Sequence, residues 1–147
     1  RAPIWDPDAR GMFFGIHGSC RKTEMAYSVL EGVVFSLYHI YESMGMPKAD
    51  RMCVSGGAAA NHTLNELKAE LFGVPVCVPE ETDASALGAW MAAAAGAGWF
   101  ADLGEAIQKV CKVQEIMEPC GRYQALLKKR FAVYKTVYPA VKGGIRP

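Results

Sequence analysis

The sequence has no marked excess of one charge. It contains 16 Lys and Arg against 15 Asp and Glu, a formal net charge of +1 at pH 7. Its longest basic run is Lys128-Lys129-Arg130, which lies in a predicted C-terminal helix, where we expect it to face solvent. Nothing in this charge pattern favours binding to nucleic acid or to an anionic membrane.

Paired cysteines and long apolar runs are also missing. The 5 cysteines never occur in a C-x-x-C spacing, so we expect neither a structural zinc nor a disulfide framework, and we expect a reducing, cytoplasmic compartment. Cys53 and Cys77 lie in apolar segments, where a thiol behaves as a small hydrophobe. The alanine-rich segment 84–97 is too short for a membrane span and is interrupted by Gly88 and Gly96.

What the sequence does contain is enough apolar material for a core. Its 147 residues have the length of one domain, and 51% of them are hydrophobic. No signal-peptide pattern is present. The first residue is Arg1 and not Met, which suggests a piece of a longer protein.

The most informative stretch is a glycine turn between a predicted strand and a predicted helix. Residues 52–54 form a short apolar run, Ser55-Gly56-Gly57 follows, and a helical pattern begins at Thr63 with capping-box spacing to Glu66. Glycines allow close backbone approach, and the N–H groups at a helix start favour an anion, so the arrangement suits a phosphate. A tight strand-to-helix turn without a ligand is an equal alternative.

The remaining elements predict an α/β fold with parallel strands. Thr82 or Asp83 is the predicted cap of a helix, and Gly73 the predicted left-handed end of another. Because two strands are too few for so many apolar helices, we expect further strands from residues 11–16, from a partner, or from sequence not present here. The predicted helices cover residues 23–44, 64–72, 84–97, 102–113 and 121–138, the predicted strands 52–54 and 74–78, and residues 1–22 are expected to be irregular.

Several single residues invite a structural explanation more than a functional one. Gly32 and Gly88 interrupt predicted helices, and close packing against a neighbouring element is the expected reason. Glu31 is expected to be a solvated charge, with a hydrogen bond to a neighbouring loop as the alternative. His17 is a lone histidine, and nothing near it in the sequence completes a metal site or a nucleophile.

Taken in order, these segments resemble the C-terminal domain of the FGGY carbohydrate kinases, the family of xylulokinase, ribulokinase and glycerol kinase. Two departures from the family pattern are Tyr27-Ser28, where Arg-Ala is usual, and Glu70, where aspartate is usual. Glu118-Pro119 and the tyrosine-bearing last helix also fit. The matching segments are Arg1–Gly11, Tyr27–Phe35, Ser55–Asn61, Lys68–Val76 and Ala84–Ala89.

The resemblance implies an actin-like ATPase fold of the ribonuclease H type, with residues 1–147 forming the C-terminal portion of its ATP-binding domain. It implies that Gly56, Gly57 and Ala58 present their backbone to the phosphates of Mg-ATP and that Asn61 faces the adenine. Asn61 suits a plain helix cap equally well. No residue here matches the family's catalytic aspartate, which is expected upstream, or a metal ligand. We therefore expect the chain alone to phosphorylate nothing.

The resemblance thus implies the ATP-binding part of a kinase that phosphorylates a sugar hydroxyl. Its xylulokinase-like opening segment implies a ketopentose such as xylulose as the substrate, and a homo-oligomer is one possible assembly. A non-catalytic actin-like module for assembly or regulation is the alternative, for which Asn61→Ala and Gly57→Val would leave nucleotide affinity unchanged. A dinucleotide-binding domain is a third hypothesis, weakened because the loop does not read G-x-G-x-x-G.

Overall fold

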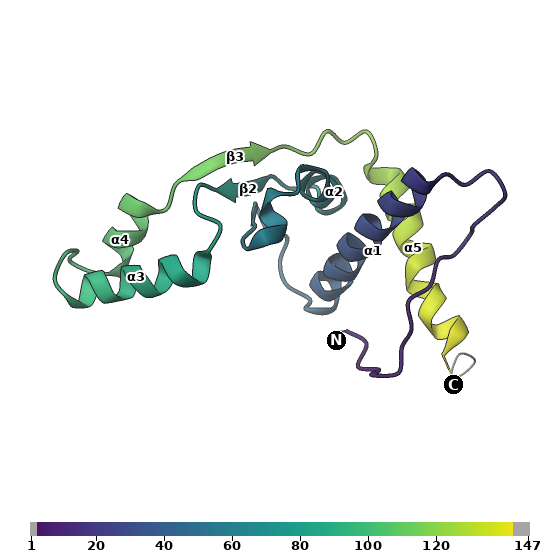
Figure 1. Cartoon of the computed structure of the whole chain (residues 1–147), viewed down its shortest axis with the longest axis horizontal. Coiled ribbons are helices and arrows are strands. Elements are labelled where there is room, and N and C mark those ends of the chain that lie inside the picture. Colours follow the sequence, from purple (N-terminus) through teal and green to yellow (C-terminus); the bar gives the residue numbers. More distant parts are fainter. Residues whose placement is uncertain (1–2, 143–147) are drawn as a thin grey trace. The chain divides into compact units, whose positions relative to one another are not determined.

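The computed structural model describes residues 3–142, which form two compact units. One unit contains residues 3–48, 70–72 and 120–142, and the other contains residues 49–69 and 73–119. Figure 1 shows the elements in chain order. They are α1 (Lys22–Ser43), β1 (Met52–Cys53), the 3₁₀-helix η1 (Gly57–Ala60), α2 (His62–Phe72), β2 (Val76–Pro79), α3 (Ala84–Gly96), α4 (Leu103–Val110), β3 (Val113–Met117) and α5 (Gln124–Val141).

The second unit is built on a three-stranded sheet of order β1-β2-β3. Strands β1 and β2 are parallel, as predicted, with Met52 opposite Val76. Strand β3 is antiparallel to β2, so the prediction of parallel strands alone is wrong. The prediction of a helix reaching residue 113 is also wrong, because α4 ends at Val110 and β3 follows. Residues 11–16 form no strand.

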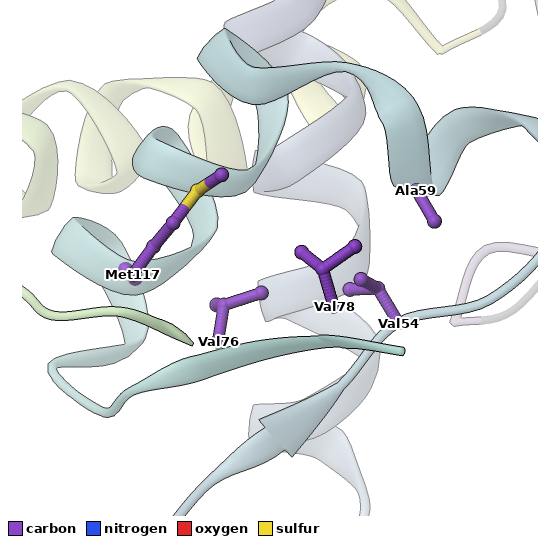
Figure 2. Packing of buried hydrophobic residues seen from close by; sticks show 6 residues of the cluster. Val54, Ala59, Val76, Val78 and Met117 are labelled. Atoms are coloured by element: carbon purple, nitrogen blue, oxygen red, sulfur yellow. The ribbon is translucent and has the colours of Figure 1, made fainter. Parts of the chain in front are cut away.

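The core of this unit lies on one face of the sheet. Val76 and Val78 of β2 project to the same side, where Val54 and Met117 meet them (Figure 2). Ala59 of η1 is 2% exposed and belongs to the same cluster. The residues directly after the glycine turn are therefore anchored in the core, and this fixes where the turn sits at the end of β1.

The first unit pairs helices α1 and α5 through aromatic side chains. Phe35 and Phe131 have ring centroids 5.7 Å apart, and Glu31 accepts a hydrogen bond of 2.8 Å from Arg130. Glu31 is buried, so the expectation of a solvated charge is wrong. In the basic run, Lys129 and Arg130 are exposed as predicted, whereas Lys128 is half-buried, with its ammonium 3.8 Å from the centre of the Tyr38 ring.

Packing at the helix glycines and along α1 differs from expectation. A Cβ built on Gly32 or Gly88 would meet no heavy atom within 4 Å, so the predicted close contacts at these glycines are wrong. Only part of the apolar stripe of α1 is covered. Four of its members, spaced four residues apart, remain exposed: Met25, Val29, Val33 and Leu37.

The start of α5 is held by the carboxylate of Glu70. This buried side chain accepts hydrogen bonds from the backbone N–H groups of Gly121 (3.0 Å), Tyr123 (2.7 Å) and Gln124 (2.9 Å). Burial alone would raise the pKa of Glu70, but these bonds and one from the Cys120 side chain outweigh it and hold the pKa below its ordinary value of 4.5. Glu70, which stands where aspartate is usual in the family, thus has a structural role at the N-terminus of α5.

Candidate functional site

The turn after β1 depends on a backbone conformation that only glycine adopts readily. Gly56 has φ +76° and ψ −178°, a combination in which a side chain would be strained. Its N–H donates a hydrogen bond of 2.7 Å to the carbonyl of Thr82. The turn is therefore tied to the connection between β2 and α3, and its shape is set by Gly56 and not by packing, since a Cβ there would touch nothing.

After the turn, η1 leads directly into α2, and Asn61 marks the boundary. The Asn61 Oδ1 accepts a hydrogen bond of 3.0 Å from the backbone N–H of Leu64, and α2 begins at His62. The predicted capping box from Thr63 to Glu66 is wrong, because the first helical turn already contains Thr63. Asn61 therefore caps the helix, the alternative that the sequence left open. Gly73 ends α2 with φ +67°, as predicted.

Two buried polar residues of α2 stabilise the segment that follows the glycine turn. Asn65 is 0% exposed and donates from Nδ2 to the carbonyl of Ala59 at 2.7 Å. The buried Lys68 donates from Nζ to the Asn65 Oδ1 at 3.0 Å. Burial lowers the pKa of Lys68 below its ordinary value. Lys68 thus orients the Asn65 amide, and Asn65 holds η1. Our sequence reasoning missed both, although two polar residues at positions i and i+3 amid apolar ones were a signal.

The turn and the start of α3 enclose a hollow of about 290 Å³. As predicted, Asp83 caps α3, accepting a hydrogen bond of 3.0 Å from the backbone N–H of Ala86. Ala84 and Ser85 form the first turn of α3, where N–H groups have no partner within the helix. The lining residues are Ser55, Gly56, Gly57, Thr82, Asp83, Ala84 and Ser85.

This lining suits an oxyanion more than an apolar ligand. It offers three hydroxyl groups, backbone N–H groups and a helix start, all of which bind phosphate oxygens well. Drug-sized ligands occupy pockets of roughly 300–1,000 Å³, so the hollow lies near the lower end of this range, a size that suits a phosphate chain. Asp83 provides the one carboxylate among the lining residues.

The other candidate ligands do not assemble into a metal centre. Across residues 3–142, no group of three or more His, Cys, Asp and Glu side chains is placed to hold a metal ion. His17, on the other unit, has its Nδ1 2.9 Å from the Ser19 Oγ and forms part of a local turn. In the same described part of the chain, no helix has the length and hydropathy needed to cross a bilayer.

Comparison with known proteins gives a consistent result. The family model described as "FGGY family of carbohydrate kinases, C-terminal domain" matches residues 1–97. The chain is 30% identical over 144 residues to a xylulose kinase of Staphylococcus epidermidis, covering 97% of this chain and 29% of that one. A glycerol kinase of Myxococcus xanthus is 36% identical over 139 residues, covering 90% of this chain and 28% of its own.

Solved structures agree with these sequence relatives. The crystal structure of a ligand-bound xylulose kinase from Lactobacillus acidophilus superposes with a TM-score of 0.87 at 30% identity, over 97% of this chain and 29% of that chain. The fold is thus that of the actin-like ATPases, as predicted. The chain spans less than a third of the length of these relatives.

Proposed function

The chain belongs to the FGGY family of carbohydrate kinases, and we propose that it forms the C-terminal part of the ATP-binding domain of an ATP-dependent sugar kinase. The observation that carries this proposal is the polar hollow at the Gly56 turn. It lies where the parallel strands β1 and β2 end, and ligands of open α/β sheets bind beyond the carboxyl ends of such strands.

The phosphate chain of the nucleotide is assigned to the backbone of the turn. Gly57 and Ala58 would offer their N–H groups, whereas the Gly56 N–H is already donated to Thr82 and Gly56 would contribute only a close backbone approach. A Cβ built on either glycine meets nothing within 4 Å, so the space above them is open to a ligand. Asn61 is assigned to the adenine. Its Oδ1 is used by Leu64, so the side-chain NH₂ is the group that would donate to a ring nitrogen.

Magnesium would accompany ATP. Mg²⁺ commonly binds through one or two carboxylates together with the substrate phosphates, and Asp83 is the residue of the hollow that fits this requirement. The bound ion would neutralise phosphate charge during transfer to the sugar hydroxyl. We assign the general base that accepts the proton of that hydroxyl to the part of the relatives' length that this chain does not span, and we expect the 147-residue chain alone to release no ADP.

The acceptor is proposed to be a ketopentose such as xylulose, and the protein is proposed to act in the cytoplasm. Support for the acceptor comes from the xylulose kinases among the relatives. A glycerol kinase is just as similar in sequence, so the assay must include several acceptors. Coupled ADP release from the native polypeptide, tested with xylulose, ribulose, glycerol and gluconate, is expected to be fastest with xylulose; a faster rate with glycerol or gluconate would overturn this assignment.

Nucleotide binding can be tested with the 147-residue chain itself by calorimetric titration of a non-hydrolysable ATP analogue with Mg²⁺. We expect weak binding, with a dissociation constant on the order of 1 mM. Gly56→Ala should weaken it about tenfold or more, because strain at a positive φ costs about 1–3 kcal/mol and shifts the turn. Gly98→Ala is the matched control, since Gly98 has φ +80° but lies outside the hollow.

The Gly98→Ala control distinguishes a change in the shape of the glycine turn from a general loss of stability. Both substitutions place a side chain at a positive φ, and only Gly56→Ala changes the proposed phosphate site. Equal loss of affinity in the two variants, or no binding by the unmodified chain, would overturn the proposed function.

A further inference from the structure

Two of the cysteines lie opposite each other on neighbouring strands. Cys53 of β1 and Cys77 of β2 are register partners in the parallel ladder. Adjacent strands lie about 4.8 Å apart, and disulfides join residues whose Cα atoms are about 4.4–6.8 Å apart. The backbone therefore places this pair within the range that a disulfide spans.

The two side chains also share a face of the sheet. Their neighbours Met52 and Val76 form the preceding register pair, and these point to the core face. Because side chains alternate along a strand, Cys53 and Cys77 project to the opposite face. Burial and the nearby Cys53 thiol, which shares a hydrogen bond with Cys77, raise the pKa of Cys77. The two thiols are therefore neighbours on this face of the sheet.

The two cysteines differ in accessibility. Cys53 is exposed, which corrects the expectation that it is a buried hydrophobe, whereas Cys77 is 5% exposed as expected. On β3, the register partner of Cys77 is Ile116, which is 55% exposed. A reagent from solvent can therefore reach Cys53 first, and Cys77 is the buried thiol next to it.

We propose that Cys53 and Cys77 form a reversible redox pair that closes to a disulfide across β1 and β2. A low-molecular-weight disulfide is the oxidant. The Cys53 thiolate attacks one of its sulfurs, forming a mixed disulfide and releasing one thiol. The Cys77 thiolate then attacks the Cys53 Sγ and releases the second thiol. Two protein thiols are oxidised, one external disulfide is reduced to two thiols, and the two protons are taken up by them.

The other three cysteines have different surroundings. The Cys111 Sγ lies 3.9 Å from the sulfur of Met91, the Cys20 Sγ accepts a hydrogen bond from the backbone N–H of His17, and the Cys120 side chain bonds Glu70. Cys53 lies two residues before Ser55, with Val54 between Cys53 and the start of the glycine turn.

Peptide mapping of the folded 147-residue chain tests the proposal, with oxidised glutathione as the probe. Trypsin places the pair in separate peptides, residues 52–68 and 69–109, and neither contains a second cysteine. We expect oxidation to lower the intact mass by about 2 Da, to link these two peptides, and to be reversed by dithiothreitol. Cys53→Ser should abolish the link, and Cys111→Ser should leave it in place.

A further variant keeps the test informative. Cys77→Ser is expected to trap glutathione on Cys53, because the resolving thiol is gone. The proposal would be overturned if the unmodified chain also retained glutathione on Cys53 with Cys77 still available for alkylation after unfolding. It would also be overturned if the link formed only in denaturant.

Discussion

Replacing Glu70 by glutamine tests how a buried carboxylate holds the start of α5. Both Tyr123 and Gln124 donate to one oxygen of Glu70, Oε1, while Gly121 donates to the other, Oε2. Glutamine keeps the shape and can keep one carbonyl oxygen for the first two donors. Its NH₂ group then faces the N–H of Gly121, and the negative charge at the helix N-terminus is lost.

The cost follows from these contacts. Losing the hydrogen bond from the Gly121 N–H to a charged acceptor costs about 1.5–3 kcal/mol. Loss of the favourable charge at the helix start adds about 0.5–1 kcal/mol. We therefore expect Glu70→Gln to lower the free energy of unfolding by about 3 kcal/mol, a large part of the stability of a small domain.

Urea unfolding followed by circular dichroism measures this loss, and amide hydrogen exchange at Gly121 locates it. Glu66→Gln is the matched control, because Glu66 lies on the same helix with its side chain 59% exposed and faces His62 at 3.4 Å. Exposed pairs of this kind contribute about 0–1 kcal/mol. The reasoning is refuted if the two variants lose equal stability, or if exchange at Gly121 does not accelerate in Glu70→Gln.

Three further predictions follow from other buried polar contacts and from pH. Because the folded pKa of Glu70 lies below 4.5, the stabilisation by its carboxylate is complete above about pH 4.5 and is lost as the pH falls through the folded pKa. In urea unfolding, the free energies of unfolding of the unmodified chain and of Glu70→Gln should therefore converge in acid. Lys68→Met should weaken nucleotide binding in calorimetry about threefold to tenfold by releasing Asn65, with little loss of stability, since methionine removes a buried charge; a large loss of stability with unchanged affinity would contradict this. Arg130→Met should lower the free energy of unfolding by about 1–2 kcal/mol in urea by leaving Glu31 buried without its partner, and equal stability would count against that ion pair.

Local chemistry made much of the site region predictable. An apolar run followed by two glycines indicates a strand and a turn, Gly73 is the residue that a left-handed helix end needs, and Asp83 is a good cap. Each of these depends on a few neighbouring residues. The order and spacing of the motifs then indicated the family, which the comparisons confirmed. The roles of Gly56 and Asn61 toward nucleotide remain predictions.

Features that depend on distant partners were not predictable in the same way. Strand β3 carries Gln114 and Glu115 in its middle and buries only Met117, so its sequence has no strand-like apolar pattern. It is a strand because β2 supplies its hydrogen bonds. Glu31 reads as a surface charge until Arg130 of another helix is placed beside it.

The same holds for the polar support of the turn. Asn65 and Lys68 occupy buried positions of α2 because each satisfies the other and the carbonyl of Ala59. That satisfaction requires η1 to fold back over the helix, which no local propensity encodes. Cys53 was expected to be buried because its neighbours are apolar, and it is exposed because only one face of β1 is covered by the core.

The central claim is that the glycine turn holds the phosphates of a nucleotide, and backbone amide chemical shifts test it most directly. The ¹⁵N-labelled chain would be titrated with a non-hydrolysable ATP analogue and Mg²⁺. The account predicts that the amide resonances of Gly56, Gly57, Ala58 and Ser85 move together and saturate with one dissociation constant. Binding that moves other amides while these four stay unchanged would contradict it.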